Sequence, residues 1–167
     1  FRAGIKLVKT AEALEHTLPS SIRNSLANIV TESAVEVNKN LAKYGYHLPP
    51  YPPNTFVTKA VTQTEIKGQF VRYAINKDYV ARRFIVEKRL VDGLSPHDIK
   101  DVLQLPEIPI YISEVSIPAG VTLRYGSVNK IYNQTSRTVR TQWEIAEELI
   151  TDRSVFMKMF SEARKLK

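Results

Sequence analysis

A chain of 167 residues with a net charge of +7 and a pI near 9.6 has the size of one domain, or of one domain with a helical extension. No apolar run reaches the roughly 18 residues that cross a bilayer, and the absence of cysteine excludes disulfides, thiolate nucleophiles and cysteine-based zinc sites. The excess of lysine and arginine favours binding to phosphate backbones or to an acidic protein, although a basic surface also simply keeps a protein soluble.

The first part of the chain is expected to be helical. Apolar residues recur at helical spacing in residues 5–16, and Pro19 ends this helix. A second helix is predicted from Ser20 or Ser21 to about Tyr44, where Gly45 stops it. Phe1 is not an initiating methionine and no apolar signal segment follows it, so we expect the chain to be part of a longer protein.

A proline-rich stretch then separates two regions. Four prolines between residues 49 and 53 favour an extended, stiff linker, and a motif for a proline-recognition module is the alternative. The predicted organisation is a helical leader at residues 1–47, a linker at 48–54 and a compact domain at 55–167.

Beyond the linker, alternation of apolar and polar residues predicts strands at residues 56–63, 66–75, 110–117, 121–128 and 138–145. Helices are expected at residues 79–90, 95–105 and 152–167. Short connections between the strands imply a largely antiparallel sheet. The predicted fold class is therefore α+β: an N-terminal helical segment, then a domain with a mainly antiparallel sheet of four to five strands and flanking helices.

The sequence contains no glycine-rich phosphate loop, no HExxH and no GxSxG motif. Its three histidines, His16, His47 and His97, lie far apart without metal-ligand spacing, so neither a metal site nor a cofactor is expected. His97 lies in the first turn of a predicted helix, where the helix dipole lowers the pKa of an imidazole and suits it as a general base. Such residues are also often simply exposed.

Residues 124–144 contain four cations and one acid, interleaved with hydrogen-bonding side chains. This composition is typical of sites that recognise phosphates and bases. On the predicted strand, Arg140, Gln142 and Glu144 share one face, which is a candidate site or else the solvated side of an edge strand. Separately, Arg72 interrupts an apolar strand, where it either binds a phosphate or pairs with a neighbour.

A resemblance joins these segments. Leu105-Pro106, Pro118-Ala119-Gly120 and Gln142-Trp143-Glu144 follow one another in a region, residues 66–150, that resembles the C-terminal toxin domains of bacterial polymorphic toxins, such as contact-dependent growth inhibition effectors. The chain departs from that pattern before Gln142, where residues 132–137 replace the expected Gly-Gly turn. If glycines in such a turn let a nucleotide approach the backbone, that contact is in question here.

The resemblance implies a toxin carried by a larger secreted or cell-surface effector and delivered into the cytoplasm of a neighbouring bacterium. It also implies a cognate immunity protein as partner, and it gives the helical leader a role in entry.

Three activities follow from these residues. The first is a metal-independent ribonuclease acting on tRNA, with His97 or Glu144 for proton transfer, cations on the phosphate, and a translation factor of the target cell as a further partner. The second is an NAD glycohydrolase or ADP-ribosyltransferase, because Arg72 with Gln142-x-Glu144 resembles the arginine and glutamine-x-glutamate arrangement of ADP-ribosyltransferases. The third is a basic module that binds RNA or protein without catalysis. The candidate catalytic residues are His97, Arg72, Arg124, Gln142 and Glu144, and the candidate substrate-binding residues are Tyr73, Arg137, Thr138, Arg140 and Thr141.

Overall fold

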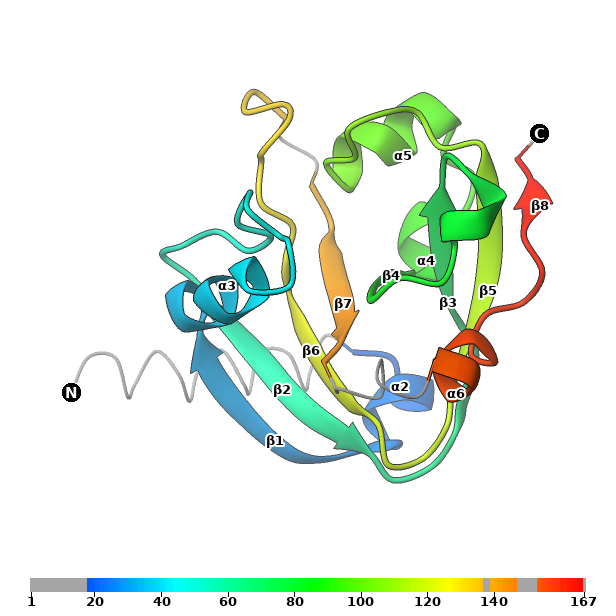
Figure 1. Ribbon diagram of the computed structural model, residues 1–167. Coiled ribbons are helices and arrows are strands. Elements are labelled where there is room, and N and C mark those ends of the chain that lie inside the picture. The colour runs from blue at the N-terminus through cyan, green and yellow to red at the C-terminus, as the bar shows by residue number, and fades with distance from the viewer. Residues whose placement is uncertain (1–17, 137–138, 147–152, 167) are drawn as a thin grey trace.

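The computed structural model describes residues 18–136, 139–146 and 153–166, and within them the main feature is one antiparallel sheet (Figure 1). Its eight strands lie in the order β1-β2-β6-β7-β4-β3-β5-β8. The strands are β1 (Leu26–Ser33), β2 (Phe56–Thr62), β3 (Ile66–Ala74), β4 (Phe84–Glu87), β5 (Tyr111–Ile117), β6 (Thr122–Ser127), β7 (Thr141–Ile145) and β8 (Arg164–Lys165).

The helices of the described residues are short. They are α2 (Ser20–Arg23), α3 (Ala34–Ala42), α4 (Lys88–Val91), α5 (Pro96–Val102), α6 (Arg153–Met157) and the 3-10 turn η1 (Lys77–Tyr79). None of them is long and apolar enough to cross a membrane. α5 begins as the sequence predicts, with Pro96 in its first turn and the Ser95 hydroxyl accepting a hydrogen bond from the Asp98 amide at 3.2 Å.

The predicted fold class is wrong. The sheet has eight strands rather than four or five, and the part of the chain that the structure describes is mainly sheet, with short helices, rather than a small sheet with flanking helices. The predicted helix up to Tyr44 is replaced by β1 followed directly by α3. The apolar residues from Leu26 to Leu41 fit a helical period only because a strand and a helix join without a break, while β-branched Ile29, Val30 and Thr31 favour the strand.

Two other predicted helices are also replaced. Residues 79–90 contain β4, whose Phe-Ile-Val sequence suits a strand and which pairs with both β3 and β7. Of the predicted terminal helix, residues 153–157 are helical and Arg164–Lys165 pair with β5.

The sheet folds around an interior core. β2 pairs with β6 and β3 with β5, so two long stretches of chain run side by side and bend together near Thr62 and Val121. The Thr62 hydroxyl fixes this bend by donating to the Pro118 carbonyl at 2.7 Å and accepting from the Val121 amide at 2.9 Å. The β4–β7 pair then joins the two halves, which face each other in Figure 1.

Three groups of buried side chains fill the molecule. The central group lies between the two halves of the sheet and includes Phe70, Leu123 and Trp143. A second group packs α4 and α5 against β3 and β5, and a third packs α3 against β2. The sheet therefore has a covered outer surface on both halves.

The proline-rich stretch belongs to this packed unit. Tyr51 is fully buried, and the Asn38 side chain bonds both its backbone groups, donating to the Tyr51 carbonyl at 2.8 Å and accepting from the Tyr51 amide at 3.1 Å. Because β1 pairs with β2, and α3 and Tyr51 pack against β2, residues 26–62 belong to one packed unit. The predicted borders at residues 47 and 54 fall inside it, and residues 1–17 of the predicted leader lie outside the described residues.

Gly126 is expected to be intolerant of a side chain. A Cβ there would lie 2.9 Å from Tyr51 Cδ1 and 3.0 Å from Cε1. The ring is fully buried and its hydroxyl is bonded to Glu144, so Gly126→Ala should lower the free energy of unfolding by about 1–3 kcal/mol. Urea unfolding measures this, with the exposed neighbour Ser127→Ala as control, expected to change stability by less than about 0.5 kcal/mol. Equal stability of the two variants would contradict the tight contact.

Candidate functional site

Arg72 on β3 is a cation in a poorly hydrated position. It is partly buried, its Nη1 donates to the Phe84 carbonyl at 3.0 Å, and its Nε is buried without a hydrogen-bond partner among the described residues. Burial lowers the pKa of Arg72 to about 10, against an opposing effect of Tyr46, and the nearby charge of Arg82 lowers it further. No carboxylate of the described residues forms an ion pair with it. A buried donor without a partner costs free energy. Because Arg72 as a whole is only partly buried and lines cavities, its guanidinium is a candidate to bind an external acceptor.

Two cavities adjoin this arginine. The first cavity has a volume of about 480 Å³ and is lined by residues 45–48, 50, 72, 84, 103–106, 128, 129, 131, 132 and 142. The second cavity has a volume of about 370 Å³ and is lined by residues 72–76, 79, 82, 105–107 and 109. Arg72, Leu105 and Pro106 line both, and a narrow space of about 40 Å³ beside Arg72 also contacts Gln142.

Hydrogen bonds fix the wall of the first cavity. The Asn129 side chain donates to the Pro49 carbonyl at 2.8 Å, and the Gln142 side chain donates to the Pro50 carbonyl at 2.9 Å. On the opposite side, Gln104 is buried and its Oε1 accepts from the amides of Tyr132 at 2.9 Å and Asn133 at 2.7 Å. These bonds hold the proline-rich stretch and the segment after β6 in place, so the cavity is preformed.

The predicted site residues divide between different places. Arg72 and Gln142 line the first cavity together, and Tyr73 lines the second. His97 is exposed on the first turn of α5 and does not line either cavity.

Of the other predicted substrate-binding residues, the two that the structure describes do not line these cavities either. Arg140 is partly buried, with Nε 3.4 Å from the Leu90 carbonyl, and Thr141 is partly buried on β7. Neither lines a cavity, while Arg137 and Thr138 lie outside the described residues.

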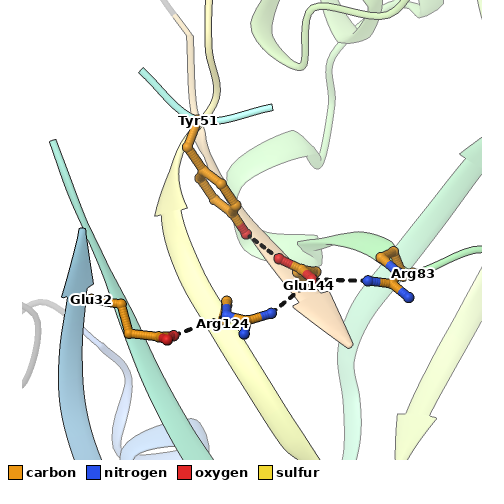
Figure 2. Close-up of polar contacts among 5 residues, drawn as sticks. All are labelled: Glu32, Tyr51, Arg83, Arg124 and Glu144. Carbon is orange, nitrogen blue, oxygen red and sulfur yellow. Dashed lines mark hydrogen bonds and ion pairs between the residues drawn. The ribbon is translucent and has the colours of Figure 1, made fainter. Parts of the chain in front are cut away.

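Glu144 and Arg124 belong to a buried ionic network (Figure 2). Glu144 has no exposed surface; its Oε1 accepts from the Tyr51 hydroxyl at 3.1 Å, and its Oε2 lies 3.2 Å from Arg124 Nη1 and 3.4 Å from Arg83 Nη1. Arg124 also pairs with Glu32 at 2.9 Å. Since Glu144 has no contact with solvent, it holds Tyr51 by a hydrogen bond and two arginines by ion pairs, and it is not placed to contact a ligand.

Desolvation dominates the electrostatics of this network. Burial raises the pKa of Glu144, while the charges of Arg124 and Arg83 oppose that change. Burial and the neighbouring Glu144 raise the pKa of the Tyr51 hydroxyl well above its usual range, so it remains a donor at neutral pH.

Several cavity residues were not predicted as functional. His47 was assigned to the end of the helical leader, and Tyr79 and Arg82 to a helix. The sequence carries one usable signal for His47: it is a polar residue between Tyr46 and Leu48, next to a segment too rich in proline to move freely.

Within the described ranges, no three His, Asp or Glu side chains lie close enough together to hold a metal ion. What the arrangement offers chemically is a confined cation, a histidine and amide side chains around a cavity of ligand size. Comparisons with protein-family models, with curated proteins and with solved structures gave no match for this chain.

Proposed function

We propose that this protein is a ribonuclease that acts without a metal ion and binds an RNA phosphate at Arg72. The observation that carries the proposal is the unpartnered, buried Nε of Arg72 beside a cavity of about 480 Å³. Carboxylate and phosphate oxygens are the acceptors that suit a guanidinium best, and no described carboxylate pairs with Arg72.

The same cavity holds a group for proton transfer. RNA cleavage through the 2′-hydroxyl needs a base for that hydroxyl, an acid for the leaving oxygen and a cation at the phosphate. His47 is exposed and lines the first cavity with Arg72, whereas His97 does not. An imidazole has one nitrogen that can accept a proton and one that can donate it, so it suits either proton step. His47 therefore takes the role that the sequence assigned to His97.

The same proposal includes the biological role of the ribonuclease. On the resemblance described above, the ribonuclease is the toxin part of a larger effector, tRNA is its substrate, and an immunity protein neutralises it. Expression of the chain alone is then expected to arrest bacterial growth.

Incubation of the purified chain with total bacterial RNA in EDTA tests the activity, with NAD in a parallel reaction. We expect discrete tRNA fragments and unchanged NAD. His47→Ala should lower the cleavage rate about 10²–10⁴-fold, and the matched variant His97→Ala should cleave like the unaltered chain. Loss of activity only in His97→Ala would overturn the assignment of His47. Intact RNA, even after bacterial lysate is added, would overturn the ribonuclease proposal.

One observation supports NAD chemistry as a second candidate. Arg72 and Gln142, two residues of the ADP-ribosyltransferase-like arrangement, line one cavity. The third, Glu144, is fully buried and paired with two arginines, which removes it from a developing positive charge on a sugar. For this reason the ribonuclease is preferred. Consumption of NAD with RNA left intact would reverse the order.

A further inference from the structure

The second cavity extends the binding surface beyond Arg72. Its own lining comes from the β3–β4 connection and from residues after α5, whereas the first cavity is lined by the α3–β2 connection and residues after β6. Arg72 lies where the two cavities share a wall with Leu105 and Pro106. An anionic group on Arg72 would therefore have a separate space on each side.

The second cavity contains an aromatic surface beside a second cation. Tyr79 is 55% exposed, and the guanidinium carbon of Arg82 lies 4.9 Å from the centre of its ring. The turn that carries Tyr79 is capped: the Asn76 side chain accepts from the Asp78 amide at 3.0 Å. An exposed aromatic ring paired with arginine is a platform on which any nucleobase stacks.

The first cavity also has aromatic walls. Tyr46 packs edge-to-face on Phe84, with ring centres 5.3 Å apart, and Tyr132 is largely exposed. Both volumes fall within the range of about 300–1000 Å³ that is typical of small-molecule sites. Each space is suited to a nucleoside, and the two are separated by a cation.

We propose that the site binds two consecutive nucleosides of single-stranded RNA, one in each cavity, with their connecting phosphate on Arg72 and the base in the second cavity stacked on Tyr79. This inference rests on the proposed ribonuclease function and names its substrate as a dinucleotide step. Arg82 adds a second cation near the phosphate. Glu107 also lines the second cavity, and as a carboxylate it suits an exocyclic amino group of the base.

Isothermal titration with 2′-deoxydinucleoside monophosphates tests the proposal, because these lack the hydroxyl needed for cleavage. They should bind at least tenfold tighter than the matching nucleoside monophosphates. Tyr79→Ala should weaken dinucleotide binding about 5- to 150-fold, the range for losing one base–aromatic stack. The control is Tyr44→Ala, because Tyr44 is 56% exposed, also has an arginine guanidinium 4.9 Å from its ring, and lines neither cavity. We expect no change for it.

Two results would overturn the two-nucleoside site. One is equal affinity for dinucleotides and mononucleotides. The other is an equal effect of Tyr79→Ala and Tyr44→Ala. If NAD binds tighter than every dinucleoside monophosphate, the ligand is a pyrophosphate dinucleotide and the RNA assignment is overturned.

The gel assay separates this inference from the proposed function. RNA cleavage without a dinucleotide preference rejects the inference and keeps the ribonuclease. Tyr79-dependent dinucleotide binding without cleavage keeps the site and rejects the activity.

Discussion

Glu144→Ala is expected to lower the free energy of unfolding by about 3–5 kcal/mol, the usual cost of removing one partner from a buried ion pair. The substitution takes away the carboxylate that pairs with Arg83 and Arg124, and the acceptor of the Tyr51 hydroxyl. Glu32 still pairs with Arg124, but among the described residues the Arg83 side chain is left with its contacts with the rings of Tyr44 and Tyr46.

Glu144→Gln should cost less, about 1–3 kcal/mol at pH 7, because the amide keeps the shape and the acceptor for Tyr51. Its cost should also depend on pH. Burial raises the pKa of Glu144, so the folded chain binds this proton more tightly than the unfolded chain does. As the pH falls from 7 toward the ordinary glutamate pKa of about 4.3, the folded chain takes up this proton before the unfolded chain does and gains stability that the glutamine variant does not gain, so the cost of Glu144→Gln should grow.

Urea unfolding at pH 7 and pH 5 measures both variants, with Glu114→Ala as control. Glu114 is exposed on β5, so its loss should change stability by less than about 0.5 kcal/mol. If Glu144→Ala is no less stable than Glu114→Ala, the network contributes nothing to the fold. A Glu144→Gln cost that shrinks on acidification would contradict the raised pKa.

Regular alternation was the most informative signal in the sequence. β2, β3, β5 and β6 lie where it predicts them, to within one residue at each end, because each is long enough for the pattern to be recognised over six residues or more. β4 was missed because it has four residues, of which Ile85, Val86 and Glu87 are all buried. A strand buried on both faces shows no alternation.

The site shows the same limit. Arg72 and Gln142 were predicted because each polar side chain stands out in its own strand. His47 and Tyr79 lie in connections, and only the order of the strands brings those connections to one arginine. Glu144 shares a strand face with Gln142, yet the first is fully buried and the second lines a cavity, because Tyr51 covers one end of that face. A polar face in sequence does not reveal what packs against it.

Arg72→Met is expected to lower the rate of RNA cleavage about 10²–10³-fold, while the fold keeps its stability. On the proposed function, the loss of rate follows from removing a preorganised cation at the phosphate. Methionine fills similar space and needs no hydrogen bond, so the buried Nε that has no partner disappears with the charge. Removing that donor is worth about 1–3 kcal/mol, and it offsets the lost hydrogen bond to the Phe84 carbonyl.

The stability of Arg72→Met relative to the unaltered chain should be the same at pH 6 and pH 9. Burial lowers the pKa of Arg72 to about 10, so the folded chain binds this proton less tightly than the unfolded chain, and stability rises with pH only above that value.

The charge control is Lys67→Ala, since Lys67 is exposed and its removal also lowers the net charge by one. Cleavage by Lys67→Ala should stay within twofold of the unaltered chain at low salt. RNA cleavage by Arg72→Met would show that Arg72 is not part of the site. Loss of cleavage together with unfolding would show that the arginine is needed for the fold. Only loss of cleavage in a folded variant fits an arginine that binds the phosphate of a substrate.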